Sequence, residues 1–103
     1  MRALPKILSF GWDKGNIDKN YKRHGVRTKE AEEIFVSDEL YVLPDIRHSL
    51  KEKRLIALGK TQKGKHLFVV FTIRRNVIRI ISARRMHKKE VLKYEKAKEN
   101  TKV

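Results

Sequence analysis

The pattern of apolar and polar residues changes from a helical period to a strand period near the middle of the chain. Before residue 38, apolar side chains recur at spacings of three and four residues, which is typical of helices with one buried face. After residue 40 they form short runs, rich in β-branched residues and separated by turn residues, which is typical of strands. The pattern therefore predicts an α+β fold.

Two helices are expected in the N-terminal part, after a short strand at residues 7–10. The first helix opens at Asp13, a residue type common at N-caps, and ends at Gly25, which suits the left-handed position after a helix. The second opens at Thr28, is followed by glutamates that the helix dipole favours, and ends near residues 37–38.

The rest of the chain predicts a sheet and a last helix. The strand-like runs are residues 40–43, 54–58, 66–73 and 77–83. Short connections between the later runs predict hairpins and hence an antiparallel sheet. The Lys- and Glu-rich segment after Arg85 predicts a helix. The expected fold is two N-terminal helices, a four-stranded antiparallel sheet and one C-terminal helix.

Length and charge narrow the class of protein. A chain of 103 residues suffices for one core, so residues 1–103 are expected to form a single domain. Lys and Arg number 26 against 12 Asp and Glu, a net charge of +14 that favours nucleic acid, an acidic protein or an anionic membrane as partner. A membrane is disfavoured because no apolar run approaches roughly 18 residues.

The absence of cysteine rules out several chemistries and points to a compartment. Without cysteine there is no disulfide, no thiolate nucleophile and no thiolate zinc site. The first nine residues contain Pro5 and too few apolar residues in a row for a secretory signal. A cytoplasmic location is therefore expected.

Arginines interrupt the last strand-like run, residues 77–85. Strict alternation would place Arg84 on one face of this strand, beside two isoleucines, and Arg79 on the opposite face. Arginine beside buried side chains is costly unless it meets an anion, so the end of the strand is a candidate phosphate site. The alternative is an edge strand whose arginines reach solvent or pair with Glu90.

The connector from Asp45 to Arg54 contains the side chains that phosphodiester cleavage needs. His48 can transfer protons near neutral pH, and Arg54 can bind a phosphate with two hydrogen bonds. Asp45 or Glu52 can orient the imidazole. The alternative is an ordinary solvated loop. A metal site from Asp45, His48 and Glu52 is disfavoured by the surrounding positive charge and by the absence of a recognised ligand spacing, so no metal or cofactor is expected.

Motifs along most of the chain together resemble one family. They are Trp12-Asp13, Asn20, Lys22-Arg23-His24-Gly25-Val26, Glu30-Ala31, Phe35, Asp45, His48, Glu52, Arg54, Ile78 to Arg85, Glu90 and Tyr94. Their order and spacing resemble the BrnT-type toxins of type II toxin–antitoxin systems. The sequence departs from the family pattern at Arg23, where Lys usually precedes His-Gly, and at Met86, where a small residue usually follows the paired arginines.

The resemblance implies a RelE-like compact fold and a ribonuclease that arrests translation. It also implies a BrnA-type ribbon-helix-helix antitoxin, with operator DNA bound only through the toxin–antitoxin complex. We interpret the chain as a metal-independent endoribonuclease that acts on RNA. The alternatives are a non-catalytic basic nucleic-acid-binding domain and a basic module that binds an acidic protein.

Residue types suggest a role for each candidate. His48 would transfer protons, oriented by Asp45 or Glu52, while Arg54 and Arg84 would hold the phosphate. His24, near the end of the first helix, is an alternative acid–base group. His66 and His87 have no distinctive neighbours in the sequence and receive no role. The residues expected to bind RNA are Lys22, Arg23, Arg79 and Arg85.

Overall fold

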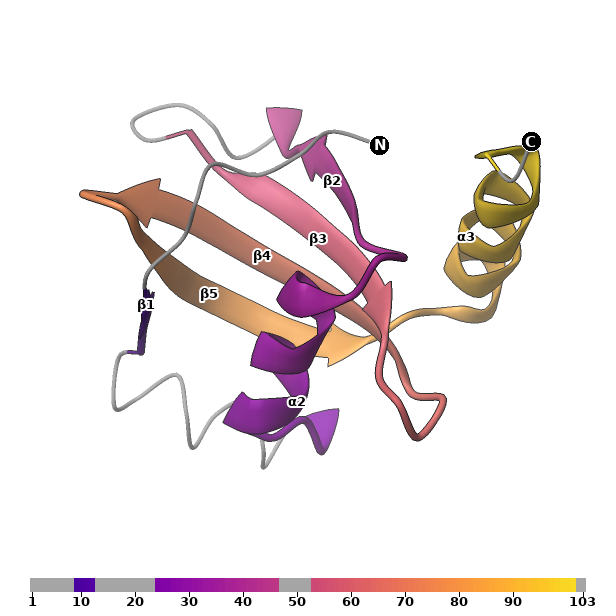
Figure 1. Cartoon of the computed structure of the whole chain (residues 1–103), viewed down its shortest axis with the longest axis horizontal. Helices are drawn as coiled ribbons and strands as arrows, with labels where there is room; N and C mark the ends of the chain where they lie inside the picture. The colour runs from indigo at the N-terminus through magenta and orange to yellow at the C-terminus, as the bar shows by residue number, and fades with distance from the viewer. Residues whose placement is uncertain (1–8, 13–23, 47–52, 102–103) are drawn as a thin grey trace.

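The protein is a five-stranded sheet with one helix in front of it and the C-terminal helix beyond one end, as the computed structural model in Figure 1 shows. The structure describes residues 9–12, 24–46 and 53–101. The elements are β1 (Ser9–Gly11), α2 (Thr28–Glu33), the 3-10 turn η1 (Ile34–Val36), β2 (Tyr41–Pro44), β3 (Leu55–Lys60), β4 (His66–Arg74), β5 (Val77–Arg85) and α3 (Lys88–Thr101). The strand order in the sheet is β1-β5-β4-β3-β2.

The predicted fold class is wrong about the sheet. Strands β2 to β5 do form the expected antiparallel meander with its two hairpins. However, β1 pairs in parallel with β5, with Ser9 opposite Val77, so the sheet is mixed and has five strands instead of four. Pairing with β1 satisfies backbone groups along β5 that an edge strand would leave open. A three-residue strand carries no sequence signal for the partner it chooses.

The N-terminal helices also differ from the prediction. The described residues contain one N-terminal α-helix, α2, instead of two, and Arg27 rather than Thr28 is its N-cap. The first predicted helix falls on residues 13–23, which lie outside the described residues. Only its last residue, His24, is described. His24 is helical, and Gly25 follows with a φ of 65°, the left-handed conformation predicted for that position.

The hydrophobic core lies between the sheet and the α2–η1 segment, on what we call the inner face. The predicted stripe of Ala31, Ile34 and Phe35 packs there, with the Phe35 ring edge-on to Phe71 at 5.0 Å between centroids. The fully buried core residues of the sheet are Ala57, Leu67, Val69, Phe71, Ile78 and Ala83. Figure 1 shows α2 over this side of the sheet.

A β-bulge interrupts the pairing of β4 with β5. Val70 lies opposite Ser82, but the next residue of β4, Phe71, lies opposite Ile80. Ile81 therefore has no partner on β4 and is the extra residue of the bulge. The alternation of side chains shifts by one residue at this point.

The bulge corrects the predicted placement of the arginines. Ala83 is buried on the inner face together with Ile80, although strict alternation would separate them. Arg84, one residue later, lies opposite Phe68 on the other side of the sheet, which we call the outer face. The exposed Arg79 alternates with buried neighbours and also belongs to the outer face. The two arginines are therefore on the same face, not on opposite faces.

The C-terminal helix α3 packs against one end of the outer face, which it reaches directly after β5. Its Tyr94 is only 2 % exposed and contacts Tyr41 of β2 edge-on. This confirms the predicted C-terminal helix. No helix in the described part of the chain is long and apolar enough to cross a membrane.

Gly59 allows the 3-10 turn to approach β3 closely. A Cβ atom at this position would lie 2.6 Å from the Cβ of Ile34. Two non-bonded carbon atoms cannot come this close, so one of the two segments would have to move. The absence of a side chain on Gly59 therefore sets how near η1 can come to the sheet.

Replacing Gly59 with alanine is expected to destabilise the fold by about 1–3 kcal/mol, because the methyl group meets the branched carbon of a fully buried residue. Urea unfolding monitored by circular dichroism measures the change. Lys63→Ala, an exposed change in the β3–β4 connection, is the control and should be near neutral. Equal stability of Gly59→Ala and the parent would contradict the close approach.

Candidate functional site

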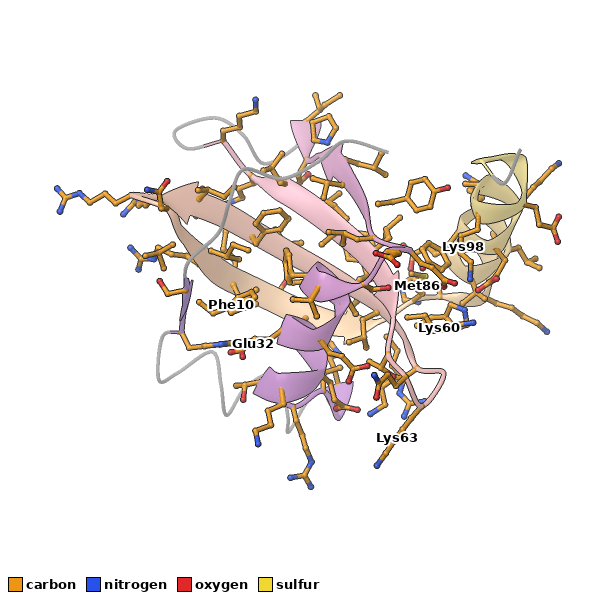
Figure 2. The ribbon with its side chains drawn as sticks, in the orientation of Figure 1. Phe10, Glu32, Lys60, Lys63, Met86 and Lys98 are labelled. Carbon is orange, nitrogen blue, oxygen red and sulfur yellow. The ribbon has the colours of Figure 1, made fainter. Side chains whose placement is uncertain are left out.

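A cluster of charged and aromatic side chains fills the end of the outer face next to α3. Tyr94 anchors it: its hydroxyl donates to the carbonyl of Glu39 at 2.7 Å, and its ring is edge-on to His66 at 5.8 Å between centroids. Burial raises the pKa of Tyr94 to about 12. Figure 2 shows Lys60 and Lys98 at this same end of the sheet.

His66, the first residue of β4, is paired with a carboxylate of α3. Its Nε2 lies 2.7 Å from Oε2 of Glu95. Lys60, directly opposite His66 on β3, has its Nζ 4.0 Å from the same oxygen. The hydrogen bond to His66, with further contributions from Lys98 and Lys60, holds the pKa of Glu95 below its ordinary value.

His66 could not be singled out from the sequence, because its partner lies 29 residues away. The available signal was strand alternation, which places His66 on the same face as Phe68. Recognising that signal requires knowing that this face meets another element. The partner of His66 is thus a neighbour in space and not in the sequence.

Arg84 is held on the outer face by three partners. Its Nη1 and Nη2 donate to the two carboxylate oxygens of Glu90 at 2.8 and 2.9 Å, while Nη1 also donates to the carbonyl of Arg85 at 3.0 Å. The guanidinium carbon lies 3.9 Å from the centroid of the Phe68 ring, a cation–π contact. The hydrogen bonds from Arg84 lower the pKa of Glu90. The Glu90 pairing was one of the sequence alternatives; the edge strand that accompanied it is corrected at residues 77–79, where β1 pairs with β5.

Lys98 holds the C-terminal part of α3 through two ion pairs. Its Nζ lies 2.7 Å from Glu39 and 3.3 Å from Glu95. Hydrogen bonding to Glu39 raises the pKa of Lys98. Three carboxylates therefore lie among cations at this end of the outer face. Glu90 and Glu95 belong to α3, and Glu39 lies in the turn before β2.

Asp45 and Arg54 meet where β2 and β3 diverge. The backbone N–H of Asp45 donates to the carbonyl of Arg54 at 2.9 Å, and Asp45 is 9 % exposed. The structure brings these two predicted site residues together. The predicted residues His48 and Glu52, on the connector between them, lie outside the described residues.

Arg54 and Arg84 are far apart on the outer face. Arg54 precedes Leu55, which pairs with Phe71, whereas Arg84 pairs with Phe68. The two arginines are thus separated by about 13 Å along the strands and by two strand spacings of about 4.8 Å each across them. The two residues are therefore not neighbours on the sheet.

The other predicted residues are spread over the molecule. Arg79 pairs with Thr72, at about the level of Arg54, and Arg85 is exposed at the end of β5. His24 is exposed; Gly25 beside it accepts a hydrogen bond from Lys65, near the β3–β4 connection. Lys22 and Arg23 lie outside the described residues. Within the described ranges, no three His, Asp or Glu side chains gather as a metal site.

The ion pairs of α3 predict a loss of stability in acid. Folding holds the pKa values of Glu90 and Glu95 below the ordinary 4.5, so their contribution is present above about pH 4.5 and is lost as the pH falls through the folded-state values. Glu95→Gln should therefore lower the melting temperature at pH 7 and have little effect near pH 3. Glu99→Gln, an exposed change on the same helix, is the control. An unchanged effect of Glu95→Gln at both pH values would contradict the ion-pair assignment.

The fold is similar to that of a solved ribonuclease toxin. The crystal structure of BrnT from Brucella abortus superimposes with a TM-score of 0.62 at 20% sequence identity, covering 79% of this chain and 99% of that chain. A comparison with curated protein sequences found no match.

The sequence also matches a family model, described as the ribonuclease toxin BrnT of type II toxin–antitoxin systems. The match runs over residues 12–90, from Trp12 beside β1 to Glu90, the partner of Arg84. Because it spans most of the chain, this chain belongs to the BrnT family of ribonuclease toxins of type II toxin–antitoxin systems.

Proposed function

We propose that this chain is an endoribonuclease toxin that cleaves single-stranded RNA at the α3 end of the outer face, without a metal ion. Membership of the BrnT family supports the substrate class. One observation supports the location: His66 and Lys60 are cross-strand neighbours, and Phe68 and Arg84 form the next such pair on the same face. An acid–base group, two cations and an aromatic ring therefore lie within about 7 Å along β4.

The proposed reaction needs proton transfer at two oxygen atoms. The ribose 2′-oxygen forms a bond to the adjacent phosphorus while the bond from phosphorus to the 5′-oxygen breaks, giving a 2′,3′-cyclic phosphate. A base takes the proton of the 2′-hydroxyl, and an acid protonates the departing 5′-oxygen. When Nε2–H of His66 donates to Glu95, the neutral ring carries its lone pair on Nδ1, where it can accept a proton.

Arg84 and Lys60 are the groups that would stabilise the additional negative charge of the transition state. Glu90 and Phe68 fix the guanidinium plane before substrate arrives, which reduces the reorganisation needed on binding. The hydrogen bonds of Arg84 within the described residues use only part of its five-donor fork, so a phosphate oxygen can be added. Fixed cations can supply the positive charge that a metal ion supplies in other nucleases.

Other candidates retain their proposed roles. Arg54 and Arg79, at a similar level of the sheet, would hold a second phosphate of the same strand. His48 and Glu52, with Asp45 as orienting residue, are proposed as a proton-transfer group that acts with or in place of His66, and His24 is a further alternative. The proposed peripheral RNA contacts are Lys22, Arg23 and Arg85.

We also propose that a BrnA-type ribbon-helix-helix antitoxin neutralises the chain. The net charge of +14 attracts RNA and repels other copies of the chain, so an acidic or polar partner gains electrostatically while it blocks the substrate. Operator DNA would then be bound by the toxin–antitoxin complex and not by the toxin alone.

Incubation of the purified chain with single-stranded RNA in EDTA tests the proposal. Cleavage is expected, with 2′,3′-cyclic phosphate ends. Arg84→Ala and His66→Ala should each slow cleavage by roughly 10²-fold or more, with the fold intact by circular dichroism. Arg84→Lys keeps the charge but loses the planar fork, so it should recover only part of the rate. Lys96→Ala, an equal change of charge at an exposed position of α3, is the matched control.

Three results would contradict parts of the proposal. RNA that is bound but remains intact would favour the non-catalytic nucleic-acid-binding domain. Activity that is lost in EDTA and restored by magnesium would refute the metal-free mechanism. Full activity of His66→Ala together with inactivity of His48→Ala would move proton transfer to the connector between β2 and β3.

A further inference from the structure

The turn between β4 and β5 places an arginine where arginine is conformationally unfavourable. Arg75 and Asn76, the two residues between the strands, have φ values of 51° and 64°. Two left-handed residues in a two-residue hairpin are typical of a type I′ turn, which favours Asn followed by Gly. Asparagine tolerates this conformation, whereas a long side chain does so less readily. An unfavourable residue at such a position suggests that its side chain serves a function.

Arg75 borders a pocket of about 490 Å3 at the β1 edge of the sheet. Among the described residues, the pocket is lined by Gly11, Trp12, Arg74, Arg75, Val77 and Arg79. Its volume is within the range of small-ligand sites. Three of these residues are arginines and none is acidic, so the lining favours an anion.

Trp12 borders the pocket, and its side chain is directed to the α2 side of the sheet. Its Nε1 donates to Oε2 of Glu32 on α2 at 2.7 Å, and the side chain packs partly against the hydrophobic core. Because this side chain is held by α2 and the core, Trp12 is a fixed reporter next to the pocket arginines.

Gly11 has no side chain that would fill the pocket. A Cβ atom there would lie 3.0 Å from Cγ1 of Val77 and 3.7 Å from Cγ of Arg79. With no side chain at Gly11, β1 can lie close to β5, and Arg79 can reach the pocket without obstruction.

We propose that this pocket binds one nucleotide of the RNA at a distance from the cleavage site, with its phosphate held by Arg75 and Arg79 next to Trp12. The inference rests on the proposed function for the identity of the ligand. Arg79 and Arg84 pair with Thr72 and Phe68, which are four residues apart on β4, so the two arginines lie about 13 Å apart along the strands, and both belong to the outer face. A single RNA strand of a few nucleotides can therefore follow β5 from the pocket to Arg84.

Arg75→Asn separates the functional role from a structural one. Asparagine suits the type I′ turn, so this variant should melt at the same temperature as the parent or higher, while a 2′-O-methyl RNA oligonucleotide binds about tenfold more weakly in fluorescence anisotropy. The slope of log affinity against log salt should fall in magnitude by about 0.7 for the lost phosphate contact. Lys96→Ala removes the same charge from exposed α3 and should change affinity much less.

Trp12 provides a local readout because it is the single tryptophan of the chain. Saturation with the same oligonucleotide should quench its fluorescence, and Arg75→Asn should shift this titration to higher RNA concentration. Equal affinities of Arg75→Asn and Lys96→Ala, or RNA binding without any change in tryptophan fluorescence, would overturn the proposal. Since the oligonucleotide has no 2′-hydroxyl, the test is independent of cleavage: quenching by an uncleaved RNA would uphold the pocket even if the ribonuclease assignment failed.

Discussion

The chemistry of the outer face depends on the extra residue in β5. Because Ile81 has no partner on β4, the strand beyond it is shifted by one residue, so that Ala83 is buried and Arg84 lies on the outer face. A regular strand would direct Arg84 toward the core, where an unpaired guanidinium would lose its hydration without compensation. The bulge therefore brings Arg79 and Arg84 to one face, which a bound strand could follow.

Helix α3 completes this face from the other direction. Its residues Glu90 and Glu95 supply the carboxylates that orient Arg84 and His66, and Tyr94 fixes the helix by its bond to the backbone of Glu39. Only Arg84 and Glu90 are close in sequence. In the other two contacts, His66 with Glu95 and Tyr94 with Glu39, the partners are far apart along the chain. Stability and chemistry are thus coupled: loosening α3 would release both the imidazole and the guanidinium from their orienting partners.

Local sequence patterns predicted the elements better than their assembly. The β-branched runs and the turn at Arg75 specify the meander from β2 to β5, and Gly25 marks a helix end through its left-handed conformation. The mixed sheet was missed because the three residues of β1 do not reveal that β5 is their partner.

The contacts of the proposed site were accessible from the sequence only where the partners are close along the chain. The pairing of Arg84 with Glu90 was one of two alternatives that the sequence left open, and six residues separate the two. His66 was missed because Glu95 lies 29 residues further along, on an element whose position is set by tertiary packing. The bulge was missed because alternation in one strand cannot show a register shift against another.

The most direct test of the account is to map RNA binding by NMR. A 2′-O-methyl RNA oligonucleotide is titrated into isotopically labelled protein, and the imidazole signals of His66 and the Nε–H signals of the arginines are followed. The account predicts that His66, Arg79 and Arg84 shift together with one saturation curve, while Arg27 at the start of α2 on the inner side remains unperturbed. Shifts confined to the α2 side, with His66 and Arg84 unchanged at saturation, would contradict it.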